Sequence, residues 1–344
     1  MSKLATDPSS VTSVGLDLAK HVFHVHAVDA DGRVVVARAL RRREVMSFFA
    51  SLPPTLVGME ACGSAHHWGR ELIALGHDVK LIPPAYVKPF VRRQKNDAND
   101  AAAIHETLWR PGLRFVRVRS VANQAVLMQH KAREMLVAQR TQLLNGLRGH
   151  LAEIGVIAAQ GASNMRALGG LIHEGDPAIP EAVRASLMPL VTQIEHLDEA
   201  IAKIDSEIAA QAKTDPVSSR LMTIPGIGPV TASALAASID DPASFSGPRE
   251  FAAFLGLVPR QHSSGGKPRL GRITKMGNSY LRKLLVVGAH SVLHHQARHN
   301  DPLRTWARKL LATKPFKLVA VATANKLARM AFALMRQNTR YTPA

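Results

Sequence analysis

The chain has 344 residues, with 44 Lys and Arg against 26 Asp and Glu, a formal net charge of +18, and 46% hydrophobic residues. This length is enough for a sizeable core in two or three domains, and the charge predicts a partner rich in negative charge, because neutralising phosphates releases condensed counterions. The single cysteine, Cys62, excludes an intramolecular disulfide framework and a cysteine zinc site, and the aromatic content of 5% argues against base stacking as the main binding mode.

The N-terminal part of the sequence predicts a mixed α/β sheet. Alternating apolar residues indicate strands at Val11–Leu18 and His21–Val28, and the turn residues Asp29–Gly32 precede a third strand, "RVVVARAL". A helical segment at Arg42–Ala50 leads to a fourth strand, "TLVGME", and a helix at Ala65–Leu75 leads to a fifth, "HDVKLIP". Strands that then alternate with helices are typical of a mixed α/β domain.

The middle of the chain predicts two long helices. Val121–Leu151 is apolar at helical spacing without an interior proline, and Glu181–Lys213 resumes that periodicity after the Gly- and Pro-containing segment "GASNMRALGGLIHEGDPAIP". Such a pair indicates either a coiled-coil or bundle hairpin or a plain helical spacer. Beyond Asp215 we expect short helical pieces. No stretch has the uninterrupted apolar length of a membrane span, and the N-terminus lacks a signal pattern, so we expect a soluble, cytoplasmic protein without a membrane partner.

Four carboxylates stand at or after the predicted strand ends: Asp17 in "GLDLAK", Glu60 in "GMEACG", and Asp97 and Asp100 in "KNDANDAAAI". The spacing of three places Asp97 and Asp100 on one face of a helix start. Clustered carboxylates repel one another, and divalent cations such as Mg²⁺ or Mn²⁺ relieve that repulsion. Two such ions, about 4 Å apart, would clamp the attacking and leaving oxygens of a phosphodiester. Taken singly, each carboxylate could instead be a helix cap, a turn residue or a solvated charge.

Basic residues just upstream of the second pair, in "VKPFVRRQK", are candidate nucleic-acid contacts: Lys88, Arg92, Arg93 and Lys95.

A second candidate phosphate contact lies in "LMTIPGIGPVTASALAAS", where Gly226 and Gly228 stand between two predicted helical arms. Glycines let backbone amides approach a phosphate, and the following helix would point its positive N-terminus at it. This fits a helix-hairpin-helix motif, which grips the nucleic-acid backbone. The alternative is a tight turn that needs glycine for close packing.

The stretch "RQHSSGGKPR" places Ser263 and Ser264 among cations. A hydroxyl in that setting is easier to deprotonate and could attack phosphorus, whereas a structural loop would use Ser-Gly-Gly for flexibility, and the stretch alone fits that plainer use at least as well. The candidate nucleic-acid contacts around it are Arg260, Lys267, Arg269, Arg272, Lys275 and Arg282.

Five motifs in order, "GLDLAK", "MEACGSAHHW", "KNDANDAAAI", "TIPGIGPVTASAL" and "HSSGGKPRLGRITKMGNSYLRKLL", resemble the DEDD transposases of bacterial insertion sequences, the IS110 family. The resemblance implies an RNase H-like (RuvC-like) α/β domain at residues 1–118, a helical coiled-coil region at 119–214, and a mainly α C-terminal transposase domain at 215–344. It assigns the metal-binding tetrad to Asp17, Glu60, Asp97 and Asp100, and the nucleophile to Ser264, which precedes the Gly pair. The doubled serine leaves Ser263 as the alternative nucleophile.

The resemblance also implies how such a protein works. It implies a homodimer or homotetramer in which carboxylates of one protomer act with the serine of another on element-end and target DNA. It further implies a structured noncoding guide RNA that pairs with this DNA, and activity at the nucleoid of a bacterial cytoplasm. A basic, aromatic-poor protein can delegate base reading to such a guide.

The sequence therefore favours a Mg²⁺-dependent transposase or recombinase that forms a phosphoserine intermediate. No nucleotide-binding loop is present, which suits phosphoryl transfer that conserves the phosphodiester energy without ATP. Two other functions stay open. The first is a junction-resolving metal nuclease that uses water as its nucleophile, and the second is a non-catalytic nucleic-acid-binding protein whose carboxylates are caps and surface charges.

Overall fold

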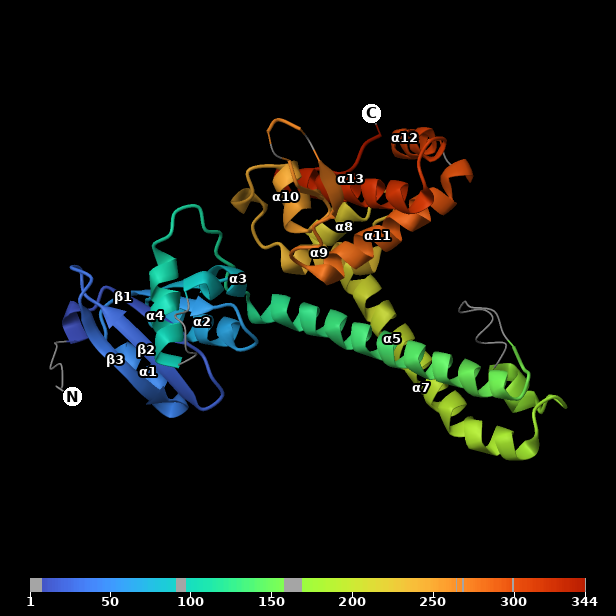
Figure 1. Cartoon of the computed structure of the whole chain (residues 1–344), viewed down its shortest axis with the longest axis horizontal. Coiled ribbons are helices and arrows are strands. Elements are labelled where there is room, and N and C mark those ends of the chain that lie inside the picture. Colours follow the sequence, from blue (N-terminus) through green and yellow to red (C-terminus); the bar gives the residue numbers. More distant parts are fainter. Residues whose placement is uncertain are drawn as a thin grey trace. The chain divides into compact units, whose positions relative to one another are not determined.

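The computed structural model describes residues 8–90, 97–157, 169–263, 265–267, 269–298 and 300–343 (Figure 1). The chain forms two compact units, Met1–Val121 and Ala122–Ala344. Asp97 and Arg298 are described by their backbone alone. Of the predicted site residues, Ser264, Arg92, Arg93 and Lys95 lie outside the described residues.

The first unit is built on a five-stranded mixed sheet in the order β3-β2-β1-β4-β5. Strand β1 pairs antiparallel with β2 and parallel with β4, and β4 pairs parallel with β5. All five predicted strands are confirmed, with these bounds: β1 Ser13–Asp17, β2 Val22–Val28, β3 Val34–Arg41, β4 Leu56–Glu60 and β5 Asp78–Ile82.

Helices cover both faces of this sheet. Val14 and Leu16 of β1 belong to one apolar cluster that includes Trp68 of α2 (Ala65–Ala74), while the alternate residue Gly15 lies against α4 (Asp97–Leu108). Successive strand residues point to opposite faces, so α2 and α4 lie on opposite sides. The remaining helices of this unit are η1 Pro8–Ser10, η2 Arg42–Glu44, α1 Val45–Ala50, α3 Pro84–Val87 and η3 Lys88–Phe90.

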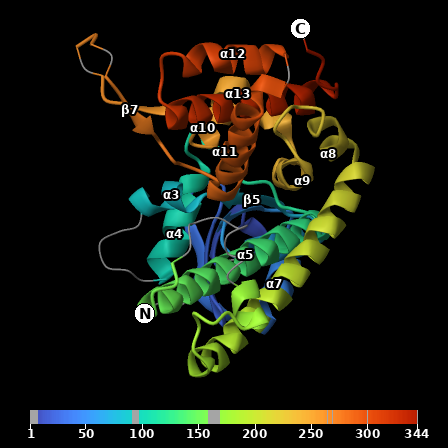
Figure 2. The ribbon, with the colours of Figure 1, turned by 90° about the vertical axis from the view of Figure 1, so that its right-hand side faces the viewer.

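The second unit begins with the two predicted long helices, α5 (Val121–Glu153) and α7 (Glu181–Thr214), which lie side by side in Figure 2. Arg133 and Arg140 of α5 form ion pairs with Asp205 and Asp198 of α7, and an apolar cluster with Leu147, Leu151, Leu187 and Val191 joins the two helices near their connection. Since the partners are seven residues apart on each helix, one face of α5 follows one face of α7 over two turns.

The rest of the second unit is mainly helical around one large apolar cluster. The expectation of short helical pieces is wrong for α11 and α13, which have 16 and 22 residues. A two-stranded hairpin, β6–β7, was also not predicted. The bounds are α8 Pro216–Leu221, α9 Pro229–Ser238, η4 Pro242–Ser244, α10 Pro248–Phe254, β6 Pro259–Gln261, β7 Leu270–Ile273, α11 Ser279–His294, η5 Gln296–Arg298, α12 Pro302–Leu311 and α13 Phe316–Gln337.

Helix α13 is long and apolar enough to cross a membrane by length and composition alone, with a mean hydropathy of 1.4 over its best window. Of that window 56% is buried inside the protein, and residues such as Ala324, Leu327 and Ala331 belong to the main cluster of the second unit. The apolar character of α13 is therefore that of a core helix packed against α10 and α11.

Candidate active site

Two of the four predicted carboxylates end neighbouring parallel strands. Asp17 is the last residue of β1 and Glu60 the last residue of β4, and the two strands pair in a register that places Leu16 beside Met59. Asp17 and Glu60 therefore lie next to each other at the carboxyl ends of two neighbouring parallel strands, where ligands of α/β proteins commonly bind.

Two glycines bring α4 onto the face that carries these carboxylates. A Cβ atom on Gly15 would lie 2.2 Å from the Ala101 carbonyl oxygen, and one on Gly58 would lie 2.7 Å from Cγ of Leu108. Because side chains two residues apart share a face, Asp17 and Glu60 project on the same side as α4. In both strands a glycine stands two residues before the carboxylate. The glycine lets α4 approach the sheet, and the carboxylate lies on the same face as α4.

The carboxylate of Asp100, in the first turn of α4, is close enough to Glu60 to affect its ionisation. Burial raises the pKa of Glu60, and the negative charge of Asp100 raises it further. Glu60 is only half-buried, so both effects are moderated by solvent. The structure thus places Asp17 and Glu60 at the carboxyl ends of neighbouring parallel strands, and Asp100 within electrostatic reach of Glu60.

The fourth predicted carboxylate, Asp97, begins α4, but its side chain lies outside the described ones. Among the side chains that the structure describes, no three His, Cys, Asp or Glu residues form a group tight enough to hold a metal ion. The donor chemistry of carboxylate oxygens nevertheless suits Mg²⁺ or Mn²⁺. Lys88, the predicted basic contact before α4, is exposed in η3.

Gly226 and Gly228 differ in their surroundings. Gly226 has a φ of +87°, and a Cβ atom there would lie 2.7 Å from the carbonyl oxygen of Gly288 in α11. Close packing therefore explains Gly226, which is the alternative that the sequence left open. Gly228 is the N-cap of α9, and a Cβ atom there would have no neighbour within 4 Å, so its predicted phosphate contact stays a prediction.

The serine-containing loop connects the two strands of the β6–β7 hairpin, which extends away from α10, α11 and α13 in Figure 2. Ser263 is hydrogen-bonded within this loop. Its Oγ accepts hydrogen bonds from the Arg269 backbone N–H at 3.0 Å and from Nε2 of Gln261 at 3.2 Å. The His262 N–H donates to the Arg269 carbonyl at 2.8 Å, which closes the pairing. Ser263 therefore braces the base of the loop.

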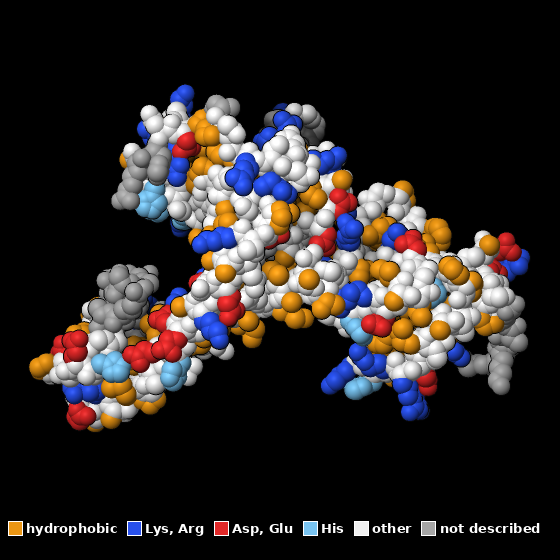
Figure 3. Space-filling model, turned by 180° about the vertical axis from the view of Figure 1, so that it is seen from behind, with side chains coloured by type: hydrophobic (Ala, Val, Ile, Leu, Met, Phe, Trp, Pro, Cys, Tyr) orange, Lys and Arg blue, Asp and Glu red, His pale blue; other side chains and the backbone are white. Residues whose placement is uncertain are grey.

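The predicted basic contacts near the hairpin fall into two groups. Arg282 makes hydrogen bonds inside the protein: its guanidinium donates to the carbonyl oxygens of Leu255 at 3.0 Å and Met276 at 2.7 Å. The other group is exposed: Arg260, Lys267, Arg269, Arg272 and Lys275. Figure 3 shows Lys and Arg at many separate places on one face of the protein rather than in one patch.

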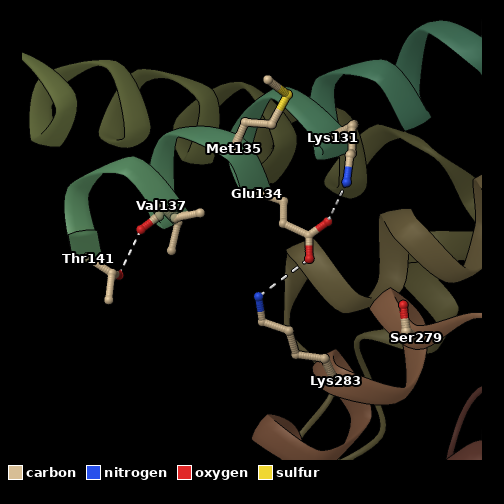
Figure 4. Close-up of a pocket in the computed structure, with 8 residues that line it drawn as sticks. Lys131, Glu134, Met135, Val137, Thr141, Ser279 and Lys283 are labelled. Carbon is tan, nitrogen blue, oxygen red and sulfur yellow. Dashed lines mark hydrogen bonds and ion pairs between the residues drawn. The ribbon is translucent and has the colours of Figure 1, made fainter. Parts of the chain in front are cut away.

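Sequence reasoning missed an open groove of about 580 Å³ between α5 and the start of α11. Glu134 lies between Lys131 at 3.3 Å and Lys283 at 3.6 Å, and Met135 lines the groove, 55% exposed (Figure 4). These ion pairs partly neutralise both lysines. No linear motif signals such a groove, since its lining comes from residues about 150 positions apart.

Comparison with known proteins identifies the family of this chain. Residues 14–156 match a DEDD family model described as "Transposase", and residues 218–304 match the "Transposase IS116/IS110/IS902 family". A "Probable family 20 transposase" of Pseudomonas aeruginosa is 47% identical over 97% of this chain and 99% of its own length.

Two further relatives are transposases of named insertion sequences. The transposase for insertion sequence element IS1111A of Coxiella burnetii is 39% identical over 95% of this chain and 90% of its own length. The transposase for insertion sequence element IS1328 of Yersinia enterocolitica is 37% identical over 96% of this chain and 98% of its own length. The chain therefore belongs to the IS110 family of insertion-sequence transposases, and DNA is its partner.

Proposed function

We propose that this transposase cleaves and exchanges DNA strands by divalent-metal-dependent phosphoryl transfer through a phosphoserine intermediate. The observation that carries the proposal is the convergence of Asp17, Glu60 and Asp100 at one sheet edge, with the pKa of Glu60 raised by its burial and by Asp100. Together with Asp97, these carboxylates would hold one or two Mg²⁺ or Mn²⁺ ions. A bound ion would polarise the scissile phosphate.

We assign the nucleophile to Ser264. The two hydrogen bonds that Ser263 accepts support this choice, because a hydroxyl that braces the hairpin must break those contacts before it can attack. The Ser264 Oγ–P bond forms as a P–O bond of the DNA backbone breaks, and the serine proton passes to solvent or a nearby base. The departing strand oxygen takes up a proton from solvent and leaves as a hydroxyl. The hydroxyl of another strand then displaces the serine.

We further propose that the active site is composite and the assembly a dimer or tetramer, with a structured noncoding RNA as guide. In a composite site, the carboxylates of one copy act on DNA together with Ser264 of another copy. Mixing Asp17→Asn protein with Ser264→Ala protein should then restore part of the activity that each lacks alone. If the mixture stays inactive, each copy uses its own serine.

The guide can be tested through binding. The exposed basic residues and the low aromatic content favour contacts with backbone phosphates over base stacking. RNA transcribed from the element ends should bind this protein more tightly than an RNA of equal length and shuffled sequence at the same salt concentration. Equal binding of the two RNAs would remove the guide from the proposal.

The metal site is tested by cleavage of labelled DNA that carries the element ends. We expect Asp17→Asn and Glu60→Gln to lower the cleavage rate at least about a thousandfold, equivalent to about 4 kcal/mol of transition-state stabilisation. Asp78→Asn is the matched control, because Asp78 begins β5 at the opposite end of the parallel strands and is ion-paired with Lys80. Full activity of Asp17→Asn would show that the carboxylates are structural.

A further inference from the structure

Two residues on one face of β1, Ser13 and Gly15, contact α4 in succession. Ser13 Oγ lies 2.9 Å from Nε2 of His105, and a Cβ atom on Gly15 would lie 2.2 Å from the Ala101 carbonyl oxygen and 2.7 Å from the His105 backbone nitrogen. Asp17 follows on the same face. Since residue numbers rise along β1 as they fall along α4, the strand and the helix run antiparallel.

Two residues of β1 and four residues of α4 cover nearly the same length along this contact. Two strand residues span about 6.7 Å, and four helix residues span about 6 Å. One step of two residues along β1, from Ser13 to Gly15, corresponds to one step of four along α4, from His105 to Ala101. The next step brings the first turn of α4, which contains Asp100, to the level of Asp17.

A directional contact between β1 and α4 can fix the position of the helix along the strand. Apolar packing beneath α4, through Ala103, Ile104 and Leu108, and the close approach at Gly15 hold α4 against the sheet, but these contacts do not depend on direction as a hydrogen bond does. A hydrogen bond loses strength steeply when its geometry changes. The pair of Ser13, which is 1% exposed, and the half-buried His105 is therefore suited to fix the register.

His105 is suited to this contact because it stays neutral. Burial, and secondarily the positive charge of His26 when that ring is protonated, lower the pKa of His105 to about 4. The Trp109 indole N–H also approaches Nε2, at 3.5 Å. An indole N–H can only donate, so this contact favours the tautomer with the imidazole proton on Nδ1, in which Nε2 accepts the hydrogen bond from the Ser13 hydroxyl.

We propose that the Ser13–His105 hydrogen bond sets the register of α4 on β1, so that His105 is a positioning residue for the carboxylates Asp17, Glu60 and Asp100. This inference rests on the proposed function, in which these carboxylates bind a divalent cation. It assigns a role to two residues outside the proposed carboxylate site, and it predicts that their contact affects Asp100, five residues or about one and a half helical turns from His105.

The test measures Mn²⁺ binding to the full chain by the loss of the free-ion EPR signal. We expect Ser13→Ala and His105→Leu each to weaken Mn²⁺ binding roughly tenfold, as is typical when the support of a ligand is removed. His105→Gln should recover most of the affinity, because its amide oxygen can accept the Ser13 hydrogen bond near the position of Nε2. Ser13→Thr should likewise keep most of the affinity, because threonine retains the hydroxyl that donates to His105.

A second buried histidine of the same unit provides the matched control. His77 is 5% exposed, accepts a hydrogen bond from the Thr55 N–H at 3.2 Å and lies 3.1 Å from the Phe49 carbonyl oxygen through its other ring nitrogen. It directly precedes β5, at the opposite end of the parallel strands from the carboxylates. His77→Leu should lower the melting temperature as His105→Leu does, yet leave Mn²⁺ affinity within twofold of the wild type. Equal losses of affinity in both variants would mean that instability, not register, causes the effect.

The failures of the two proposals are distinguishable. If wild-type protein binds Mn²⁺ no better than Asp17→Asn protein does, the metal proposal itself is wrong. If the wild type binds and Asp17→Asn does not, but Ser13→Ala and His105→Leu bind as the wild type, then the register inference is wrong and the metal proposal stands.

Discussion

The two candidate catalytic regions are built in opposite ways. The carboxylate edge belongs to the interior framework of the first unit, where Gly15 and Gly58 let α4 pack directly on the sheet. The serine loop belongs to an exposed two-stranded hairpin, where Gly265 and Gly266 have no neighbour within 4 Å of an added Cβ. One region is fixed by packing in the core, and the other is held by a few hydrogen bonds.

This difference suits the two proposed tasks. Ligands of a metal ion must hold their separations, so rigid elements that carry them are an advantage. A nucleophile that meets the carboxylates of another copy must reach outward, and an exposed hairpin allows this. Glycine substitutions should therefore cost more stability beside the carboxylates than in the hairpin.

The largest expected effect on stability is that of Gly15→Ala. The new methyl group would lie 2.2 Å from a helix carbonyl and 2.7 Å from a helix nitrogen, so α4 must move away from β1. We expect a loss of about 3 kcal/mol or more in the free energy of unfolding, measured by urea titration of circular dichroism. A variant as stable as the wild type would contradict the close approach.

Gly265→Ala is the corresponding change in the hairpin. Its φ of +56° is strained for alanine, but no atom obstructs the methyl group. The same titration should show a loss of about 1 kcal/mol or less. A loss as large as that of Gly15→Ala would mean that the hairpin is packed rather than exposed.

An intermediate effect concerns pH in the absence of metal. Because the pKa of Glu60 is raised above its ordinary value of 4.5, the folded protein holds that proton more tightly than the unfolded chain does. The associated stability is present below pH 4.5 and is lost as the pH rises through the raised pKa. In EDTA, Glu60→Gln should therefore melt a few degrees higher than the wild type at pH 7, and the difference should shrink on acidification. Scanning calorimetry of both proteins checks this, and a destabilised Glu60→Gln would contradict it.

The smallest expected effect is that of a single exposed cation on the hairpin. Arg272→Ala should weaken DNA binding similarly for all sequences and reduce the slope of log affinity against log salt by about one. Filter binding at several salt concentrations measures that slope. An unchanged slope would show that Arg272 makes no phosphate contact.

Periodic sequence patterns predicted the sheet and the long helices well. Strand β2 alternates between buried and less buried residues, and α5 and α7 are helical over more than thirty residues each. The predicted positions of Asp17 and Glu60 at strand ends and of Asp100 in the first turn of a helix are confirmed, and their role in metal binding stays a prediction. By contrast, β6 and β7 have only three and four residues, nearly all exposed, which is too short for a period to appear.

Contacts distant in sequence could not be predicted. The packing of Gly226 on Gly288 and the hydrogen bond between Ser13 and His105 depend on how helices meet partners 62 and 92 positions away. The hydrogen bonds of Ser263 with Arg269 and Gln261 form because the chain folds into a hairpin here, whereas the composition of this stretch also suited a flexible loop. These are the contacts that refine the proposed roles of the predicted residues.

The measurement that tests the central claim most directly is a search for a covalent protein–DNA adduct. Wild-type, Ser264→Ala and Ser263→Ala proteins are incubated with element-end DNA, RNA transcribed from the element ends and Mg²⁺, and then resolved on denaturing gels. We expect an adduct with the wild type, none with Ser264→Ala, and a reduced amount with Ser263→Ala. Cleaved DNA with free ends and no adduct would contradict the claim and assign the attack to water, and an adduct lost only in Ser263→Ala would assign the attack to Ser263.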